Sequence, residues 1–105
     1  MERRAIMFSG RVQGVGFRVT TREVARGFPV TGWVRNEPDG TVRCEVQGEQ
    51  TECGRFLEAL CSRMAGYVAS ADYELIPIVP AERAFEIRRE TSPRPASWGR
   101  RSDDC

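Results

Sequence analysis

A chain of 105 residues has room for one domain, which at this size can fold without disulfides or a structural metal. Hydrophobic residues make up 40% and charged residues 30% of the sequence, and the net charge of +1 excludes the strong positive field that would hold nucleic acid or an anionic membrane. There is no histidine, so the sequence lacks both the commonest general base and the commonest metal ligand.

Arginine supplies all 16 basic residues of the chain, because lysine is absent. A compositional bias of the genome explains this without any function. Even so, each basic group is then a permanently charged, planar guanidinium that can bind phosphate or carboxylate through two N–H groups.

The cysteines form no CxxC pair and no zinc-ligand spacing. Three of the four, Cys44, Cys53 and Cys61, fall within apolar strand or helix patterns, and the fourth is Cys105. Buried, unpaired thiols suit a reducing compartment, so we expect free thiols and a cytoplasmic location. No apolar run is long enough for a signal-peptide core or a membrane span, so no membrane partner is expected.

The first third of the chain predicts a strand, a glycine-spaced turn and a helix. Residues 4–10 read as a short, mostly buried strand, and residues 11–16 as the turn. Gly27 and Pro29 are expected to end the helix. Its apolar face recurs at helical spacing in Phe17, Thr21, Val24 and Phe28.

The middle of the chain predicts a hairpin, with strands over residues 30–35 and 41–47. Residues 36–40, Asn-Glu-Pro-Asp-Gly, have strong turn chemistry. In the second strand the alternation is expected to point Val42, Cys44 and Val46 inward and Thr41, Arg43, Glu45 and Gln47 toward solvent.

A second helix is predicted over about Thr51 to Met64, with an apolar stripe from Cys53 to Met64. Residues 68–78 read as a strand of uncertain register, and Phe85 and Ile87 mark a last short strand. From Thr91 the composition shifts to Ser, Pro and Arg, so we expect a domain over residues 1–90 and a flexible tail over residues 91–105.

The predicted order is β-α-β-β-α-β with a short extra C-terminal strand. Each helix has one apolar stripe, so both helices are expected on one face of an antiparallel sheet. This is the α+β, ferredoxin-like split β-α-β arrangement.

A glycine-spaced motif, Gly10 to Arg18 (GRVQGVGFR), leaves a strand and enters a helix. Free backbone N–H groups and the positive end of the helix dipole converge there, which favours an anion. Gly14 and Gly16 let the backbone curl around a tetrahedral anion, and Arg18 can grip two phosphate oxygens. A plain tight turn with a solvated arginine is an equally good interpretation of the spacing alone. A dinucleotide-binding loop is excluded because the third glycine and the βαβ context are missing.

Asn36 ends the first hairpin strand, beside the turn. Its amide offers a donor and an acceptor, as orienting a water molecule requires. Asparagine is also common at the start of a turn, and without other information that structural interpretation is favoured. In a split β-α-β fold, however, strand ends cluster beside the first loop, which could bring Asn36 near the anion site.

Both motifs resemble the signatures of the acylphosphatase family. Residues 10–18 look like the first signature, and residues 32–42 (GWVRNEPDGTV), followed by Gly48, match the second at the family spacing. The likeness covers about residues 4–90. Two matches at the right separation are far more specific than either alone.

The resemblance implies an enzyme that hydrolyses the carboxyl-phosphate anhydride of small acyl phosphates to carboxylate and inorganic phosphate, with no cofactor, metal or covalent intermediate. Asn36 would orient the attacking water. The phosphate would be held by Arg18 and by the backbone amides of Gln13, Gly14, Val15, Gly16, Phe17 and Arg18. Such chemistry needs no strong general acid, because the leaving group is good.

Two other interpretations stay open. A non-catalytic anion-binding or regulatory module would keep the same loop, and acylphosphatase-like domains also occur within larger carbamoyl-transferring proteins, whose zinc-finger-like cysteines are not seen here. An RNA-binding sheet would need exposed aromatic residues and a basic face, for which Trp33 is the one candidate. We expect a monomer without a nucleic-acid partner.

Overall fold

The computed structural model describes residues 1–89. It contains five strands and two helices in the predicted order: β1 (Glu2–Gly10), α1 (Phe17–Ala25), β2 (Thr31–Asn36), β3 (Val42–Gly48), α2 (Gln50–Arg63), β4 (Val68–Ile76) and β5 (Phe85–Arg88). The prediction of a flexible tail over residues 91–105 lies outside the described residues.

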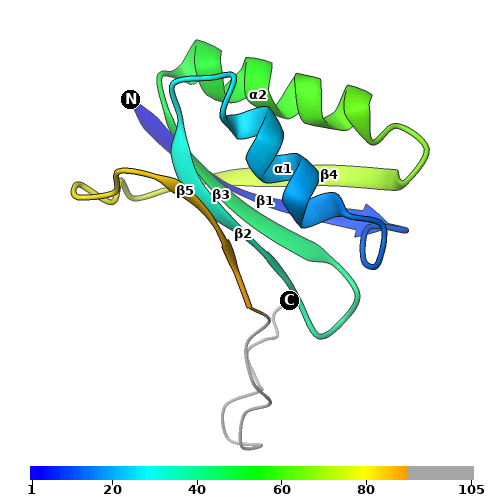
Figure 1. Ribbon diagram of the computed structural model, residues 1–105. Helices are drawn as coiled ribbons and strands as arrows, with labels where there is room; N and C mark the ends of the chain where they lie inside the picture. Colours follow the sequence, from blue (N-terminus) through cyan, green and yellow to red (C-terminus); the bar gives the residue numbers. More distant parts are fainter. Residues whose placement is uncertain (90–105) are drawn as a thin grey trace, which may run out of the picture.

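The strands form one sheet in the order β4-β1-β3-β2-β5, and α1 and α2 cover the same face of it (Figure 1). This confirms the ferredoxin-like α+β fold. The pairs β1–β3, β1–β4 and β2–β3 are antiparallel, as expected. One feature differs from the expected antiparallel sheet: β5 runs parallel to β2, so the sheet is mixed. The long β4–β5 connection causes this difference, because it carries the chain across the sheet to the far edge.

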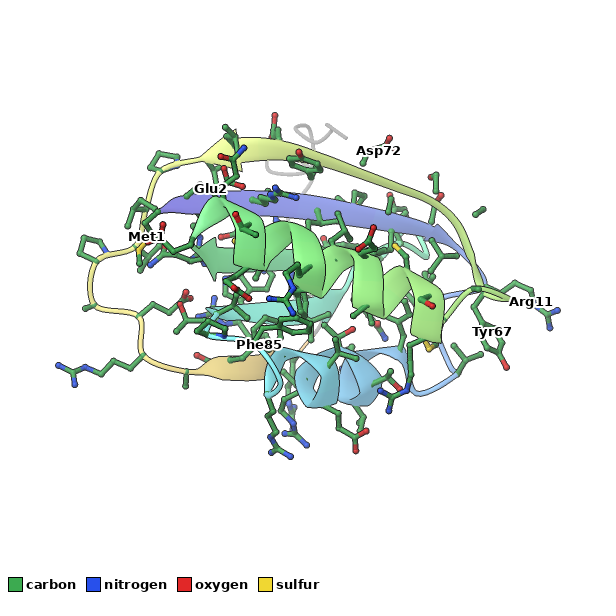
Figure 2. All side chains as sticks on the ribbon, turned by 90° about the horizontal axis from the view of Figure 1, so that it is seen from above. Met1, Glu2, Arg11, Tyr67, Asp72 and Phe85 are labelled. Atoms are coloured by element: carbon green, nitrogen blue, oxygen red, sulfur yellow. The ribbon has the colours of Figure 1, made fainter. Side chains whose placement is uncertain are left out.

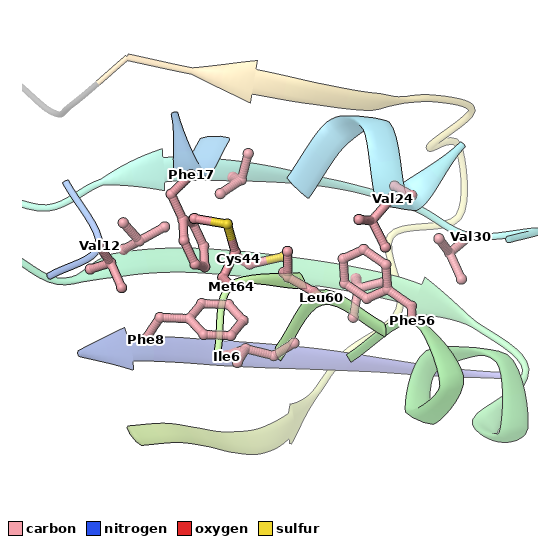
Figure 3. Close-up of a cluster of buried hydrophobic side chains, with 14 of the residues drawn as sticks. Ile6, Phe8, Val12, Phe17, Val24, Val30, Cys44, Phe56, Leu60 and Met64 are labelled. Atoms are coloured by element: carbon pink, nitrogen blue, oxygen red, sulfur yellow. The ribbon is translucent and has the colours of Figure 1, made fainter. Parts of the chain in front are cut away.

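The core lies between the sheet and the helices, and its aromatic residues come from both layers (Figure 3). Phe8 of β1 packs on Phe17 of α1 with ring centroids 5.0 Å apart. Val42, Cys44 and Val46 of β3 are fully buried, as the alternation predicts. Phe28 follows the end of α1 instead of lying within it, yet its ring still meets Phe56 of α2 edge-on.

Gly32, the second residue of β2, is a position that tolerates no side chain. Its φ is +150°, and a Cβ there would lie 1.8 Å from the carbonyl oxygen of Glu45 on β3. Such a contact is impossible without breaking the β2–β3 ladder. The glycine therefore allows β2 and β3 to pair closely where Gly32 lies opposite Val46.

Gln47 is buried at 6% exposure, so the prediction that it points to solvent is wrong. The β4–β5 connection covers it: its amide donates to the Val79 carbonyl at 3.0 Å and accepts from the Val79 N–H at 2.8 Å. The same side of the sheet buries Arg3 at 1% exposure, in contact with Glu45 and Glu82. A polar layer thus fastens residues 77–84, and with them β5, to the sheet.

Candidate active site

The loop between β1 and α1 and the turn between β2 and β3 lie at the same end of the sheet (Figure 1). The side-chain amide of Gln13 joins them, because it donates to the carbonyl of Glu37 at 2.8 Å and to that of Thr41 at 2.9 Å. In Figure 2, Arg11 and Tyr67 lie together at one end of the molecule, and the Arg11 N–H donates to the Tyr67 carbonyl at 2.8 Å. The loop is therefore held from both sides.

Two glycines give this loop its shape. Gly14 and Gly16 have φ of +77° and +76°, in the left-handed region that favours glycine. A Cβ built at either position meets no atom within 4 Å, so the backbone borders open space. Gly16 is the N-cap of α1, and the first turn of this helix has no acidic residue. The positive end of α1 and its unpaired N–H groups therefore face a space that an anion can enter.

A cavity of about 220 Å³ occupies that space. Its polar lining consists of Gly14, Gly16, Arg18 and Asn36. Arg18 belongs to the first turn of α1 and Asn36 to the last position of β2, so the fold brings together two residues that lie 18 positions apart in the sequence. Both are half-buried. None of the ion pairs within residues 1–89 involves Arg18, which leaves its guanidinium available to a ligand.

The β2–β3 turn does not depend on the Asn36 side chain. The Glu37 N–H donates to the Thr41 carbonyl at 2.9 Å, and the Gly40 N–H donates to the Glu37 carbonyl at 3.1 Å. Asp39 accepts from the Thr41 hydroxyl at 2.6 Å and the Thr41 N–H at 3.0 Å, and these bonds lower the pKa of Asp39. Since other groups close the turn, the Asn36 side-chain amide is not needed there and borders the cavity.

The remaining predicted residues fall into two groups. Phe17 lines the cavity but is buried at 2%, so it contributes its backbone N–H and an apolar wall. Gln13 and Val15 do not line the cavity: the Gln13 side chain ties the loop to the turn, and Val15 packs against the core. Thus Gly14, Gly16, Phe17, Arg18 and Asn36 surround one cavity, and Gln13 and Val15 support its wall.

Sequence reasoning missed three apolar residues of the lining: Val12, Val19 and Ile87. Val19 carried a usable signal, because it lies off the apolar stripe of α1 and is 48% exposed. Ile87 carried none, since the pairing of β5 with β2 brings it to the site from the far end of the chain.

No cysteine within residues 1–89 lines this cavity. Cys44, Cys53 and Cys61 are free thiols, and burial raises the pKa of each of them. A raised pKa makes a thiol a weak nucleophile at neutral pH. Within residues 1–89, no group of cysteine, aspartate and glutamate side chains has the geometry to hold a metal ion.

The fold and the site define a small α+β protein in which a glycine-containing loop and the N-terminus of α1 border a cavity. The acylphosphatase family model matches residues 4–87. An acylphosphatase from Salinibacter ruber is 43% identical over 82 residues, which cover 77% of this chain and 86% of that protein. An acylphosphatase from Geobacillus thermodenitrificans is 38% identical over 88 residues, covering 83% and 94% of the two chains.

Solved structures agree with the sequence matches. The acylphosphatase from Bacillus subtilis superposes with a TM-score of 0.75 at 28% identity, over 84% of this chain and 99% of that chain. HypF from T. kodakarensis contains a similar unit, with a TM-score of 0.74 at 26% identity, over 84% of this chain but 12% of that chain. The chain belongs to the acylphosphatase family and is a hydrolase of that class. None of its helices within residues 1–89 is long and apolar enough to cross a membrane.

Proposed function

We propose that the cavity at the N-terminus of α1 is where this acylphosphatase hydrolyses its substrate. The backbone N–H groups of residues 13–18 and the guanidinium of Arg18 hold the phosphoryl group, and Asn36 orients the attacking water. The observation that carries the proposal is that Asn36, unused by the turn beside it, borders the same cavity as Arg18 and the two left-handed glycines.

The lining of the cavity suits a reaction that needs charge stabilisation more than proton transfer. Among residues 1–89, Arg18 is the one charged side chain that lines it, and no carboxylate or thiol does. Attack of water on phosphorus forms a new P–O bond and breaks the bond to the carboxylate oxygen. The carboxylate leaves unprotonated, and the protons of the water stay with the released phosphate. Arg18 and the helix N-terminus stabilise the charge that spreads over the phosphoryl oxygens.

The Asn36 amide fits the role of orienting the water. Its carbonyl oxygen can accept a hydrogen bond from the water while its NH₂ group donates to a phosphoryl oxygen. A water molecule held in line with the scissile bond gains rate through positioning alone. With no histidine in the chain, positioning is the available means of activating it.

Several broader properties belong to the same proposal. The protein acts on a small acyl phosphate as a monomer, without a nucleic-acid or membrane partner, in the cytoplasm, where the thiols of Cys44, Cys53 and Cys61 stay reduced. Trp33 is 6% exposed because arginine side chains cover it, so it offers no open stacking surface for RNA. Residues 1–90 form the catalytic domain.

A phosphate-release assay with acetyl phosphate and benzoyl phosphate tests the proposal against the alternative of a non-catalytic anion-binding module. We expect turnover that excess chelator leaves unchanged and that the Arg18→Ala variant, purified in parallel, largely loses. Absence of turnover in the parent protein would support the non-catalytic module. Loss of activity with chelator and its recovery with Mg²⁺ would contradict the metal-free mechanism.

A further inference from the structure

The cavity at the N-terminus of α1 is larger than a phosphoryl group requires. Its volume is about 220 Å³, whereas a protein cavity of about 150 Å³ holds a benzene ring. Its polar residues account for one part of the lining. The other part is formed by apolar side chains of Val12, Phe17, Val19 and Ile87.

The topology places Ile87 on a definite side of the cavity. Ile87 of β5 pairs with Val34 of β2, and Asn36 lies two residues further along β2 on the same face of the sheet. Since β5 is the edge strand beyond β2, Ile87 lies outside Asn36, away from the loop that leads from β1. Ile87 therefore lies on the side of Asn36 that faces away from the proposed phosphoryl position.

Val19 contributes to the apolar lining from the helix. The residues of α1 that pack on the sheet are Phe17, Thr21, Val24 and Ala25, and Val19 has no part in that packing. It stays 48% exposed while it lines the cavity. One exposed valine needs no explanation, but an exposed valine that lines the same cavity as Ile87 forms a surface that a ligand can cover.

We propose that Val19 and Ile87 form the acyl-binding subsite, and that it selects acyl phosphates whose acyl group is apolar and uncharged, such as an aromatic ring or an aliphatic chain. The proposal rests on the proposed function of the cavity. Of the lining residues in the described part of the chain, Arg18 alone is charged, and in the proposed function the phosphoryl group occupies it. A second carboxylate on the acyl group would find no counter-charge in this lining, whereas an apolar group displaces water from an apolar wall.

Benzoyl phosphate and acetyl phosphate are a matched pair of probes, because they share the reacting group and differ in the acyl group. The test variant is Val19→Ser. Since the wall contacts the acyl group before and during reaction, losing it raises the KM for benzoyl phosphate and leaves kcat nearly unchanged. We expect the ratio of kcat/KM for benzoyl over acetyl phosphate to fall about three- to tenfold, and the inhibition constant of inorganic phosphate to stay the same.

Val79→Ser is the control, since Val79 is 42% exposed and lies in the β4–β5 connection, outside the cavity. Circular dichroism verifies that both variants are folded. An unchanged ratio in Val19→Ser, or an equal fall in Val79→Ser, overturns the subsite while the hydrolase function stands. If the parent protein hydrolyses neither substrate, the proposed function fails first.

Discussion

The buried side chain of Glu82 fastens the β4–β5 connection to the sheet, so its removal should destabilise the protein far more than an ordinary surface substitution. Its carboxylate accepts from Arg3 at 2.7 and 3.1 Å and from the Thr31 hydroxyl at 2.8 Å. Arg3 is buried, and its pKa is raised: burial alone would lower it, but the hydrogen bonds and charges of Glu82 and Glu45 outweigh that effect.

In Glu82→Ala the Arg3 guanidinium stays buried and keeps only Glu45 and Gln47, at 2.9 and 3.1 Å. Breaking a buried ion pair costs about 3–5 kcal/mol of stability. Because Glu45 and Gln47 still bind the guanidinium, we expect a loss near the lower end of this range. At roughly 4–8 °C per kcal/mol for a domain of this size, a loss of about 3 kcal/mol lowers Tm by roughly 12–24 °C.

Glu86→Ala is the matched control. Glu86 pairs with Arg88 at 3.5 Å, with side chains 58% and 44% exposed, and such a pair contributes about 1 kcal/mol or less. Thermal melts followed by circular dichroism compare the two variants, and a double-mutant cycle with Arg3→Met isolates the pair. Equal Tm values for Glu82→Ala and Glu86→Ala, or additive effects in the cycle, would refute the reasoning.

Two further predictions concern the loop and the thiols. Gln13→Ala removes the side-chain amide that joins the β1–α1 loop to the β2–β3 turn. We expect kcat to fall about 10- to 100-fold, because the loop is then misplaced relative to Asn36, while Tm changes little. The exposed Gln50→Ala is the control, and an unchanged kcat in Gln13→Ala would contradict this prediction. Among the three thiols within residues 1–89, Cys44 and Cys53 are fully buried and Cys61 is half-buried, so thiol labelling at pH 8 with peptide-resolved mass spectrometry should modify Cys61 first and the other two only on unfolding. Labelling of all three at one rate would show that the native protein opens readily.

Local pattern was enough to predict the elements that face the core. The period of two in β3 and the helical spacing in α1 and α2 each report burial on one side, and the structure places these faces against each other. The polar side of the sheet could not be predicted in this way. Gln47 and Arg3 look like surface residues in the sequence, and they are buried by partners 32 and 79 positions away.

The same limit applies to the site. Gly14, Gly16, Arg18 and Asn36 were found because their motifs and their residue chemistry are visible in the chain itself. Ile87 was not, because it reaches the cavity through a parallel pairing of β5 with β2 that no short-range pattern encodes.

The central claim is that Arg18 holds the phosphoryl group and that Asn36 orients only the water. The most direct test of this claim measures kcat and the inhibition constant of inorganic phosphate for three variants: Arg18→Ala, Arg18→Lys and Asn36→Ala. Arg18→Ala should weaken phosphate inhibition and lower kcat by about 10²–10³, and Arg18→Lys should restore little, since an ammonium lacks the two-pronged contact. Asn36→Ala should lower kcat by about 10² while phosphate inhibits as in the parent protein. A near-native kcat in Asn36→Ala, or undiminished phosphate inhibition in Arg18→Ala, would contradict the account.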